Sequence, residues 1–211
     1  MLKRFLRKEK GITGLETAII LIAFVVVAAV FAYTALSAGL FSTQKAQEAV
    51  YSGLKEAQST LEMKGSVIAT ANVTGDTGAS IGQISFTVSN TLGGSAIDFT
   101  QPTSGALGVA TGTANKVVIN YLDQTQEVNN LYWFVTKVGT DDGDFLLETG
   151  EKFQITIGAV DGGAAGNLVQ ALLPDLTVNN TFSIVVLTPA GAVLTIERTT
   201  PAYLDKIINL R

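Results

Sequence analysis

The sequence predicts an α+β fold, in which one long apolar helix at the amino end is followed by an antiparallel β-sandwich. Every residue from Ala18 to Ala32 is apolar, and no charged residue occurs between Glu16 and Lys45. This uncharged stretch exceeds the roughly 18 residues that indicate a membrane-spanning helix. After Gly65 the chain alternates short β-type segments with Gly- and Asp-rich turns, which is typical of antiparallel sandwiches.

The segment before the helix is short and basic. Residues 1–11 carry five basic residues against the single acidic Glu9, a net charge of +4. Since the whole chain carries −4, the remainder carries −8. A basic flank favours a cytoplasmic amino end, with the rest of the chain translocated. The acidic remainder argues against nucleic-acid binding, which needs clustered Lys and Arg to neutralise phosphates.

The helix is expected to continue well beyond the apolar run. Apolar residues keep helical spacing as far as Leu61, with mostly polar residues between them, so this part is amphipathic. We expect the helix to end near Met63, with Gly65 as a left-handed cap. From Leu15 to Met63 it would be about 70 Å long at 1.5 Å per residue. Such a rod is far longer than a bilayer requires and suits lateral packing against copies of itself.

The β-rich part contains seven segments with strand character. Several alternate apolar and polar residues, as half-buried strands do. The segment Thr188–Gly191 reads Thr-Pro-Ala-Gly, a natural hairpin turn because proline fixes φ. A domain of this size can bury an adequate core without disulfides. The expected strands are Ser66–Asn72, Ile81–Ser89, Lys116–Tyr121, Leu131–Val138, Lys152–Val160, Thr181–Leu187 and Ala192–Arg198.

The composition narrows the possible chemistry. The chain has 211 residues and contains no cysteine, which excludes disulfides and thiolate metal sites. It contains no histidine either, which removes the commonest general base and the commonest transition-metal ligand. These absences remove the commonest catalytic groups without excluding an enzyme. Our expectation is a structural protein that is not an enzyme and uses no cofactor.

The edge of the apolar run carries a specific motif. Residues 10–24 read KGITGLETAIILIAF, which places Lys10, Gly11, Ile12, Gly14 and Glu16 ahead of an uncharged hydrophobic segment. This motif resembles the class III signal peptide of archaeal flagellins (archaellins), which are relatives of type IV pilins. The resemblance implies that a prepilin-type membrane aspartic peptidase cuts after the glycine at position 11. The mature chain would then begin at Ile12 and keep the hydrophobic helix.

Two other interpretations of the first forty residues remain open. One is an ordinary secretory signal that is cleaved after a small residue such as Ala32 or Ala38. The other is a permanent single-span membrane anchor. Neither interpretation explains the presence of Glu16. A membrane anchor also does not explain why glycines occur at positions 11 and 14.

Glu16 is expected to act in assembly. Cleavage before Ile12 would create an α-amine that is largely cationic at neutral pH. In a helix that begins there, Ile12 and Glu16 are four residues apart and share one face. The carboxylate could therefore neutralise its own amine or that of an adjacent subunit. The alternative is a carboxylate without a partner that complements the helix dipole in the first turn.

The carboxyl half extends the resemblance. The segments ETGEKFQITI and FSIVVLTPAGAVLTIERTTPAYLDKI are similar to the closing strands, hairpin and tail of archaellins. The family implies an immunoglobulin-like sandwich outside a filament whose core is made of the amino-terminal helices. The expected division is a cleaved leader (residues 1–11), a filament-core helix (12–64) and an outer sandwich (65–211).

The resemblance implies a structural subunit of the archaeal flagellum (archaellum) filament, which serves cell motility. The expected partners are copies of this chain, related archaellins, the membrane aspartic peptidase and the motor platform, with the membrane as host before assembly. The expected location is an extracellular filament. A related archaeal type IV adhesion pilin is the main alternative, and a membrane-anchored display module is a third.

One acidic cluster is a weak candidate for a metal site. Asp141, Asp142 and Asp144 lie close together in sequence, near Glu148 and Glu151, and hard oxygen ligands suit Ca²⁺. Their spacing does not match the EF-hand loop. The alternative interpretation is a solvated turn.

Two asparagines lie in N-glycosylation acceptor triplets. They are Asn72, followed by Val and Thr, and Asn179, followed by Asn and Thr. On an exported filament protein we expect at least one of them to be modified, which would make the protein a glycoprotein.

Overall fold

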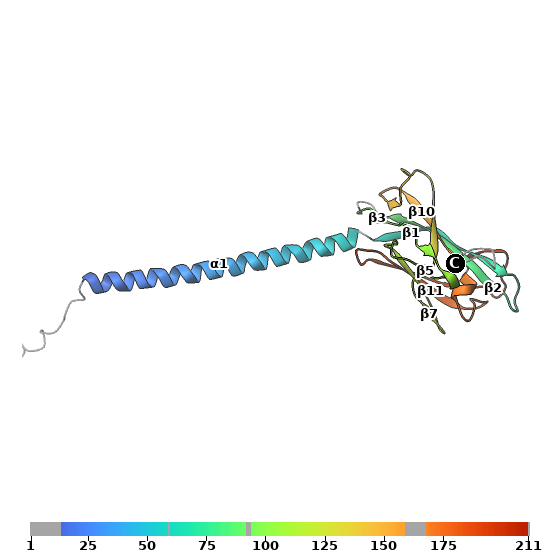
Figure 1. Cartoon of the computed structure of the whole chain (residues 1–211), viewed down its shortest axis with the longest axis horizontal. Helices are drawn as coiled ribbons and strands as arrows, with labels where there is room; N and C mark the ends of the chain where they lie inside the picture. Colours follow the sequence, from blue (N-terminus) through green and yellow to red (C-terminus); the bar gives the residue numbers. More distant parts are fainter. Residues whose placement is uncertain (1–13, 59, 92–93, 159–167, 211) are drawn as a thin grey trace, which may run out of the picture. The chain divides into compact units, whose positions relative to one another are not determined.

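The computed structural model describes residues 14–58, 60–91, 94–158 and 168–210. It contains one long helix, α1 (Gly14–Gln58), and a set of antiparallel strands (Figure 1). The chain divides into two compact units, residues 1–52 and residues 53–211. The predicted fold class, a long apolar helix followed by an antiparallel sandwich, is confirmed.

The helix ends earlier than its periodicity predicts. α1 ends at Gln58, and strand β1 (Leu61–Val73) follows at once, so the expectation of a helix as far as Met63 was wrong. The reason is tertiary: residues 61–64 pair with residues 87–90 of strand β2, and Leu61 is buried. Gly65 has φ +84° but serves as part of a bulge in β1, where the register with β2 shifts, and not as a helix cap.

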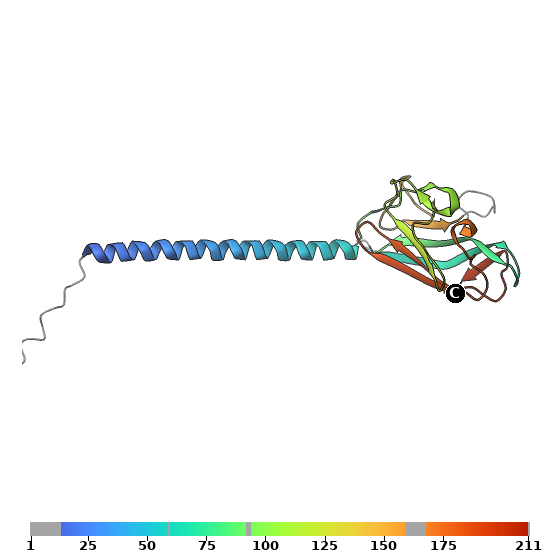
Figure 2. The same ribbon diagram turned by 60° about the horizontal axis from the view of Figure 1, so that its bottom comes forward.

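Two antiparallel sheets form the sandwich (Figure 2). The first has the order β13-β1-β2-β10-β8, and the second has the order β12-β11-β6-β7. The other strands of the first sheet are β2 (Ser80–Asn90), β8 (Trp133–Lys137), β10 (Lys152–Ile157) and β13 (Ile207–Leu210). The second sheet consists of β6 (Val118–Asp123), β7 (Glu127–Val128), β11 (Thr181–Leu187) and β12 (Val193–Thr199).

Shorter elements complete the domain. Two-residue strands form two further pairs, β3 with β9 and β4 with β5. Their bounds are β3 (Ile97–Asp98), β4 (Thr103–Ser104), β5 (Ala110–Thr111) and β9 (Leu146–Leu147), and two short helical turns are η1 (Ala106–Gly108) and α2 (Leu168–Ala171). Each of the seven predicted segments overlaps a strand, and the last two residues of the segment Lys152–Val160 lie outside the described residues. Strand β13 and the two-residue strands were not predicted.

The hydrophobic core lies between the two sheets. Alternation in β2 holds as predicted, since Ile84, Phe86 and Val88 are buried and the residues between them are half-buried. Aromatic rings fill the centre: Phe99 meets Trp133 edge-on, with 5.9 Å between ring centroids. Such edge-to-face pairs add packing energy beyond area burial.

The predicted hairpin turn between β11 and β12 is confirmed. The N–H of Gly191 donates to the carbonyl oxygen of Thr188 at 3.0 Å, and the N–H of Thr188 donates to the carbonyl oxygen of Ala192 at 3.0 Å. Gly191 has φ +95°, a conformation that favours glycine.

Candidate assembly surface and processing site

The surface of α1 is apolar on all sides. Four consecutive residues, Ile19–Ile22, stand about 100° apart around the helix axis and are all more than half exposed. By length and composition the helix could cross a membrane, and none of its most apolar window is buried against other described residues. A helix that is hydrophobic all round requires a surrounding apolar phase, either lipid or other protein.

The second half of α1 carries more polar groups. Lys45 Nζ lies 2.6 Å from Glu48 Oε2 in an exposed ion pair, which stabilises a helix by a few tenths of a kcal/mol. Val50, Tyr51 and Leu54 nevertheless remain at least half exposed. The expected amphipathic continuation is therefore present as far as Gln58, and its apolar face is also accessible to other copies.

The processing motif straddles the start of the described residues. Lys10, Gly11 and Ile12 lie outside them, so the proposed cut is not tested by the structure. Gly14 is the first residue of α1, and Glu16 lies exposed in its first turn. The Thr17 hydroxyl donates to the Gly14 carbonyl oxygen at 3.2 Å. The structure thus places the carboxylate where it complements the helix dipole.

The aspartates of the acidic cluster stabilise a turn. Lys137 Nζ lies 3.5 Å from Asp141 Oδ1. Among the described residues, no three acidic side chains gather into a group that could hold a metal ion. Each aspartate accepts a hydrogen bond from the backbone N–H two residues further on, at 2.9, 3.2 and 2.7 Å for Asp141, Asp142 and Asp144 respectively.

The two acceptor asparagines differ in accessibility. Asn179 is exposed and lies in the turn that precedes β11, with φ 54°. Asn72 is half-buried near the end of β1. A glycosyltransferase needs an accessible asparagine on a surface loop, so the geometry favours Asn179 over Asn72.

A carboxylate that the sequence analysis did not single out organises one end of the sandwich. Asp123 accepts hydrogen bonds from the backbone N–H and hydroxyl of Thr125 at 2.6 and 2.7 Å, and from the Tyr121 hydroxyl at 2.8 Å. Burial and the neighbouring carboxylate raise the pKa of Tyr121 well above its usual range. The Asp-x-Thr spacing at a strand end is a turn signal that could have identified this site.

Comparison with known proteins gives a consistent result. A sequence profile of the archaeal-type flagellin family matches residues 11–198. The chain is 39% identical to "Probable flagellin 2" of Archaeoglobus fulgidus over 94% of this chain and 93% of that protein. It is 38% identical to "Probable flagellin 1" of the same organism over 98% of each.

Solved structures agree. The chain is similar to the subunit in the archaeal flagellum of Methanospirillum hungatei, with 26% identity, a TM-score of 0.60, and coverage of 94% of this chain and 99% of that one. The crystal structure of archaeal flagellin FlaB1 from Methanocaldococcus jannaschii matches with 12% identity and a TM-score of 0.51, over 72% of this chain and 96% of that one. The second similarity concerns the fold alone.

Proposed function

Because the chain belongs to the archaeal-type flagellin family, we propose that it polymerises through α1 into the filament of the archaeal flagellum and so serves cell motility. It is a structural filament subunit. The observation that carries this function is the surface of α1, which is apolar on all sides. The relatives named above are flagellins and not adhesion pilins, so nothing here favours the pilin alternative or the display module.

The apolar side chains of α1 must be covered both before and after assembly. Fourteen large apolar side chains between Leu15 and Leu40 are more than half exposed. Each is worth about 1.5–3 kcal/mol when fully transferred out of water. Lipid tails satisfy these side chains before assembly, so leaving the bilayer gains little hydrophobic energy. Close packing between helices must then provide the net stabilisation of the filament.

Leader removal is the step that releases the helix. The basic residues 1–11 hold the amino end on the cytoplasmic side, and cleavage after Gly11 removes that anchor. A prepilin-type membrane aspartic peptidase is the proposed partner, because the Lys10-Gly11 pair matches the motif of its substrates. Amino-terminal sequencing of native filaments should give Ile12 as the first residue. A first residue of Met1 or Tyr33 would refute the cut.

The remaining partners follow from a place in the filament. Copies of this chain and related archaellins would surround α1, and a motor platform in the membrane would turn the assembled filament. The filament lies outside the cell, which exposes the sandwich to modification. Asn179 is the preferred glycan acceptor because it is exposed in a turn. Mass spectrometry of the peptide that contains Asn179 would reveal the added mass.

A genetic experiment tests the function directly. A strain that lacks this chain should lose filaments and swimming, and the wild-type chain should restore both. The control is a chain from which residues 1–58 are deleted, so that it keeps the sandwich but lacks α1; it should restore neither. A deletion strain that swims normally but no longer attaches to surfaces would favour the adhesion pilin instead.

A further inference from the structure

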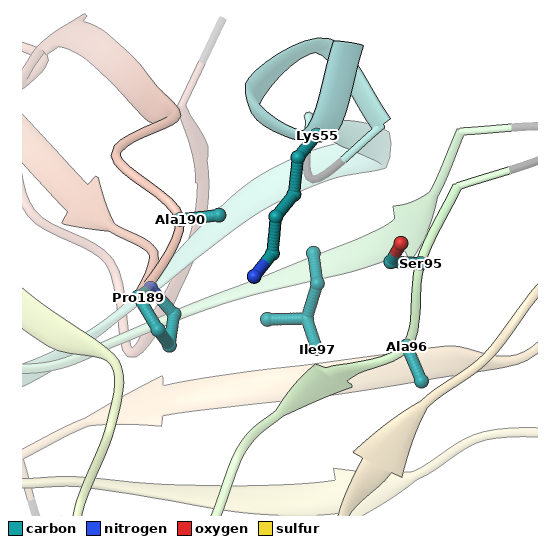
Figure 3. A pocket seen from close by; sticks show the side chains of 6 residues that line it. All are labelled: Lys55, Ser95, Ala96, Ile97, Pro189 and Ala190. Carbon is teal, nitrogen blue, oxygen red and sulfur yellow. The ribbon is translucent and has the colours of Figure 1, made fainter. Parts of the chain in front are cut away.

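A small apolar pocket opens at one end of the sandwich unit (Figure 3). Its volume is about 160 Å³. An apolar cavity of about 150 Å³ is large enough to hold benzene, so this pocket can hold one aliphatic side chain. Figure 3 shows Lys55 and the methyl group of Ala190 directed into it. All its lining residues belong to the unit that begins at Gly53: Lys55, Ser95, Ala96, Ile97, Pro189 and Ala190.

A single leucine protrudes from the domain elsewhere. Leu173 is 90% exposed, more than any other large hydrophobic residue among the described residues. Its backbone is held by the side-chain amide of Gln126. The Leu173 N–H donates to Gln126 Oε1 at 2.8 Å, and Gln126 Nε2 donates to the Pro174 carbonyl oxygen at 2.6 Å. A single exposed leucine is common on protein surfaces. Leu173 differs because hydrogen bonds with Gln126 fix the backbone on both sides of it, which holds its side chain ready for a partner.

The clamp is anchored in the hydrophobic core. The Gln126 N–H donates to Asp123 Oδ1 at 2.9 Å, and the fully buried Tyr121 donates its hydroxyl to the same carboxylate at 2.8 Å. Leu173 is thus fixed through Gln126 and Asp123 to the centre of the domain. Because its backbone is already ordered, a partner that binds Leu173 does not meet the entropic cost of ordering a loop.

The leucine and the pocket lie at opposite ends of strand β11. At the start of β11, Phe182 pairs with Asp123, next to the clamp. At its end lies the Thr188–Gly191 turn, which contributes Pro189 and Ala190 to the pocket. The six residue steps between these ends span on the order of 20 Å. A side chain of Leu173 therefore does not reach the pocket of its own chain.

We propose that Leu173 of one subunit inserts into the pocket formed by Ile97, Pro189 and Ala190 on a second copy of this chain. The inference rests on the proposed function, because it requires neighbouring copies. A contact between two different surfaces of one molecule is heterologous, and such contacts generate open helical polymers when they do not close into rings. Charges agree with this pairing, since Lys55 borders the pocket and Asp175 lies two residues after Leu173.

Cysteine cross-linking tests the contact in assembled filaments. The wild-type chain contains no cysteine, so any disulfide must come from introduced residues. We expect filaments of the double variant Leu173→Cys, Ala190→Cys to give a ladder of multimers after mild oxidation, which collapses to monomer on reduction. Each single variant should stay monomeric. The Cα atoms of a disulfide lie about 6 Å apart, so a ladder requires the proposed contact between copies.

The matched control replaces the leucine by another exposed apolar residue. Ile207 in β13 is 69% exposed, and the pair Ile207→Cys, Ala190→Cys should give roughly tenfold less multimer, since its thiols lack the effective concentration of a real contact. If the double variant does not assemble, co-assembly of the two single variants in one filament should give a reducible dimer. Filaments without a ladder or dimer overturn this contact alone, whereas a wild-type chain that forms no filaments overturns the proposed function.

Discussion

At the scale of single residues, Asp123 couples pH to the stability of the sandwich. Burial acts to raise the pKa of this carboxyl group. Hydrogen bonds from Thr125, Tyr121 and Gln126 outweigh burial and lower the pKa to about 2, from the ordinary value of 3.8. A depressed folded-state pKa stabilises the fold above the unfolded pKa, and that stabilisation is lost as the pH falls toward 2.

The first prediction concerns the acid sensitivity of this network. We expect Asp123→Asn to lower the free energy of unfolding by about 1–2 kcal/mol at pH 7, because hydrogen bonds to a charged group are replaced by weaker ones. Between pH 5 and 2 the difference from wild type should shrink. Both the stability difference at pH 7 and its change with pH can be measured by thermal unfolding of the detergent-solubilised chain, followed by the fluorescence of the single, buried Trp133. A pH-independent difference would show that the carboxylate charge is not the cause.

Glu16 carries the second prediction. We expect Glu16→Gln to be processed normally but to assemble poorly, because an unpaired Ile12 amine would enter an apolar helical core at a cost of several kcal/mol. The measurement is the yield of sheared filaments beside the gel mobility of the cell-bound protein. The matched control is Glu48→Gln, which removes an exposed carboxylate from the same helix. Wild-type filament yield from processed Glu16→Gln would show that this charge is not needed.

At the scale of elements, the end of β10 depends on a glycine. Gly158 has φ +82°, and a Cβ atom there would lie 2.4 Å from the Gly82 carbonyl oxygen. We expect Gly158→Ala to destabilise the sandwich by roughly 2–4 kcal/mol, through both backbone strain and a backbone clash. Gly150→Ala is the control, since its φ is +97° but nothing lies within 4 Å. Gly150→Ala should therefore show the cost of backbone strain alone, about 1–2 kcal/mol. If both variants lose the same stability in the Trp133 unfolding assay, a steric clash at Gly158 is excluded.

Local sequence patterns correctly predicted those helices and strands that carry one strong hydrophobic pattern of their own. The apolar run specifies α1, and the alternation in β2 and β10 specifies the faces of two neighbouring strands. The end of α1 escaped prediction because Leu61 continues the helical spacing, whereas its burial against the sheet decides its conformation. β13 escaped because its four residues become a strand only by pairing with β1, some 140 residues earlier in the chain.

The candidate sites divide in the same way. The processing motif is local, so the proposed roles of Gly14 and Glu16 follow from sequence spacing alone. The clamp on Leu173 joins residues that are 47 positions apart, and no local pattern marks Gln126 as its partner. The pocket likewise combines a helix end, β3 and a hairpin turn. A site whose residues come from distant parts of the chain can be identified only once the three-dimensional structure is known.

At the scale of the whole molecule, the early end of α1 redefines the autonomous domain. We expect residues 60–211 to fold as a β-rich monomer, whereas residues 65–211 should be less stable. The shorter fragment lacks the buried Leu61 and the four pairs from Leu61–Asn90 to Lys64–Thr87. Its melting temperature should be lower by on the order of 5–10 °C. Circular dichroism of both fragments decides this, and equal melting temperatures would show that residues 60–64 contribute nothing.

The position of β1 has a mechanical consequence for the proposed filament. Any tension that travels along the backbone from α1 enters the sandwich at Leu61, the first residue of β1. That strand is clamped on both edges, by β2 along most of its length and by β13 at Val67–Thr70. To extract it, a force must rupture two ladders of hydrogen bonds, not one. Strand β13 thus fastens β1 along its second edge, so a sandwich in the proposed filament would resist forces that pull it away from its helix.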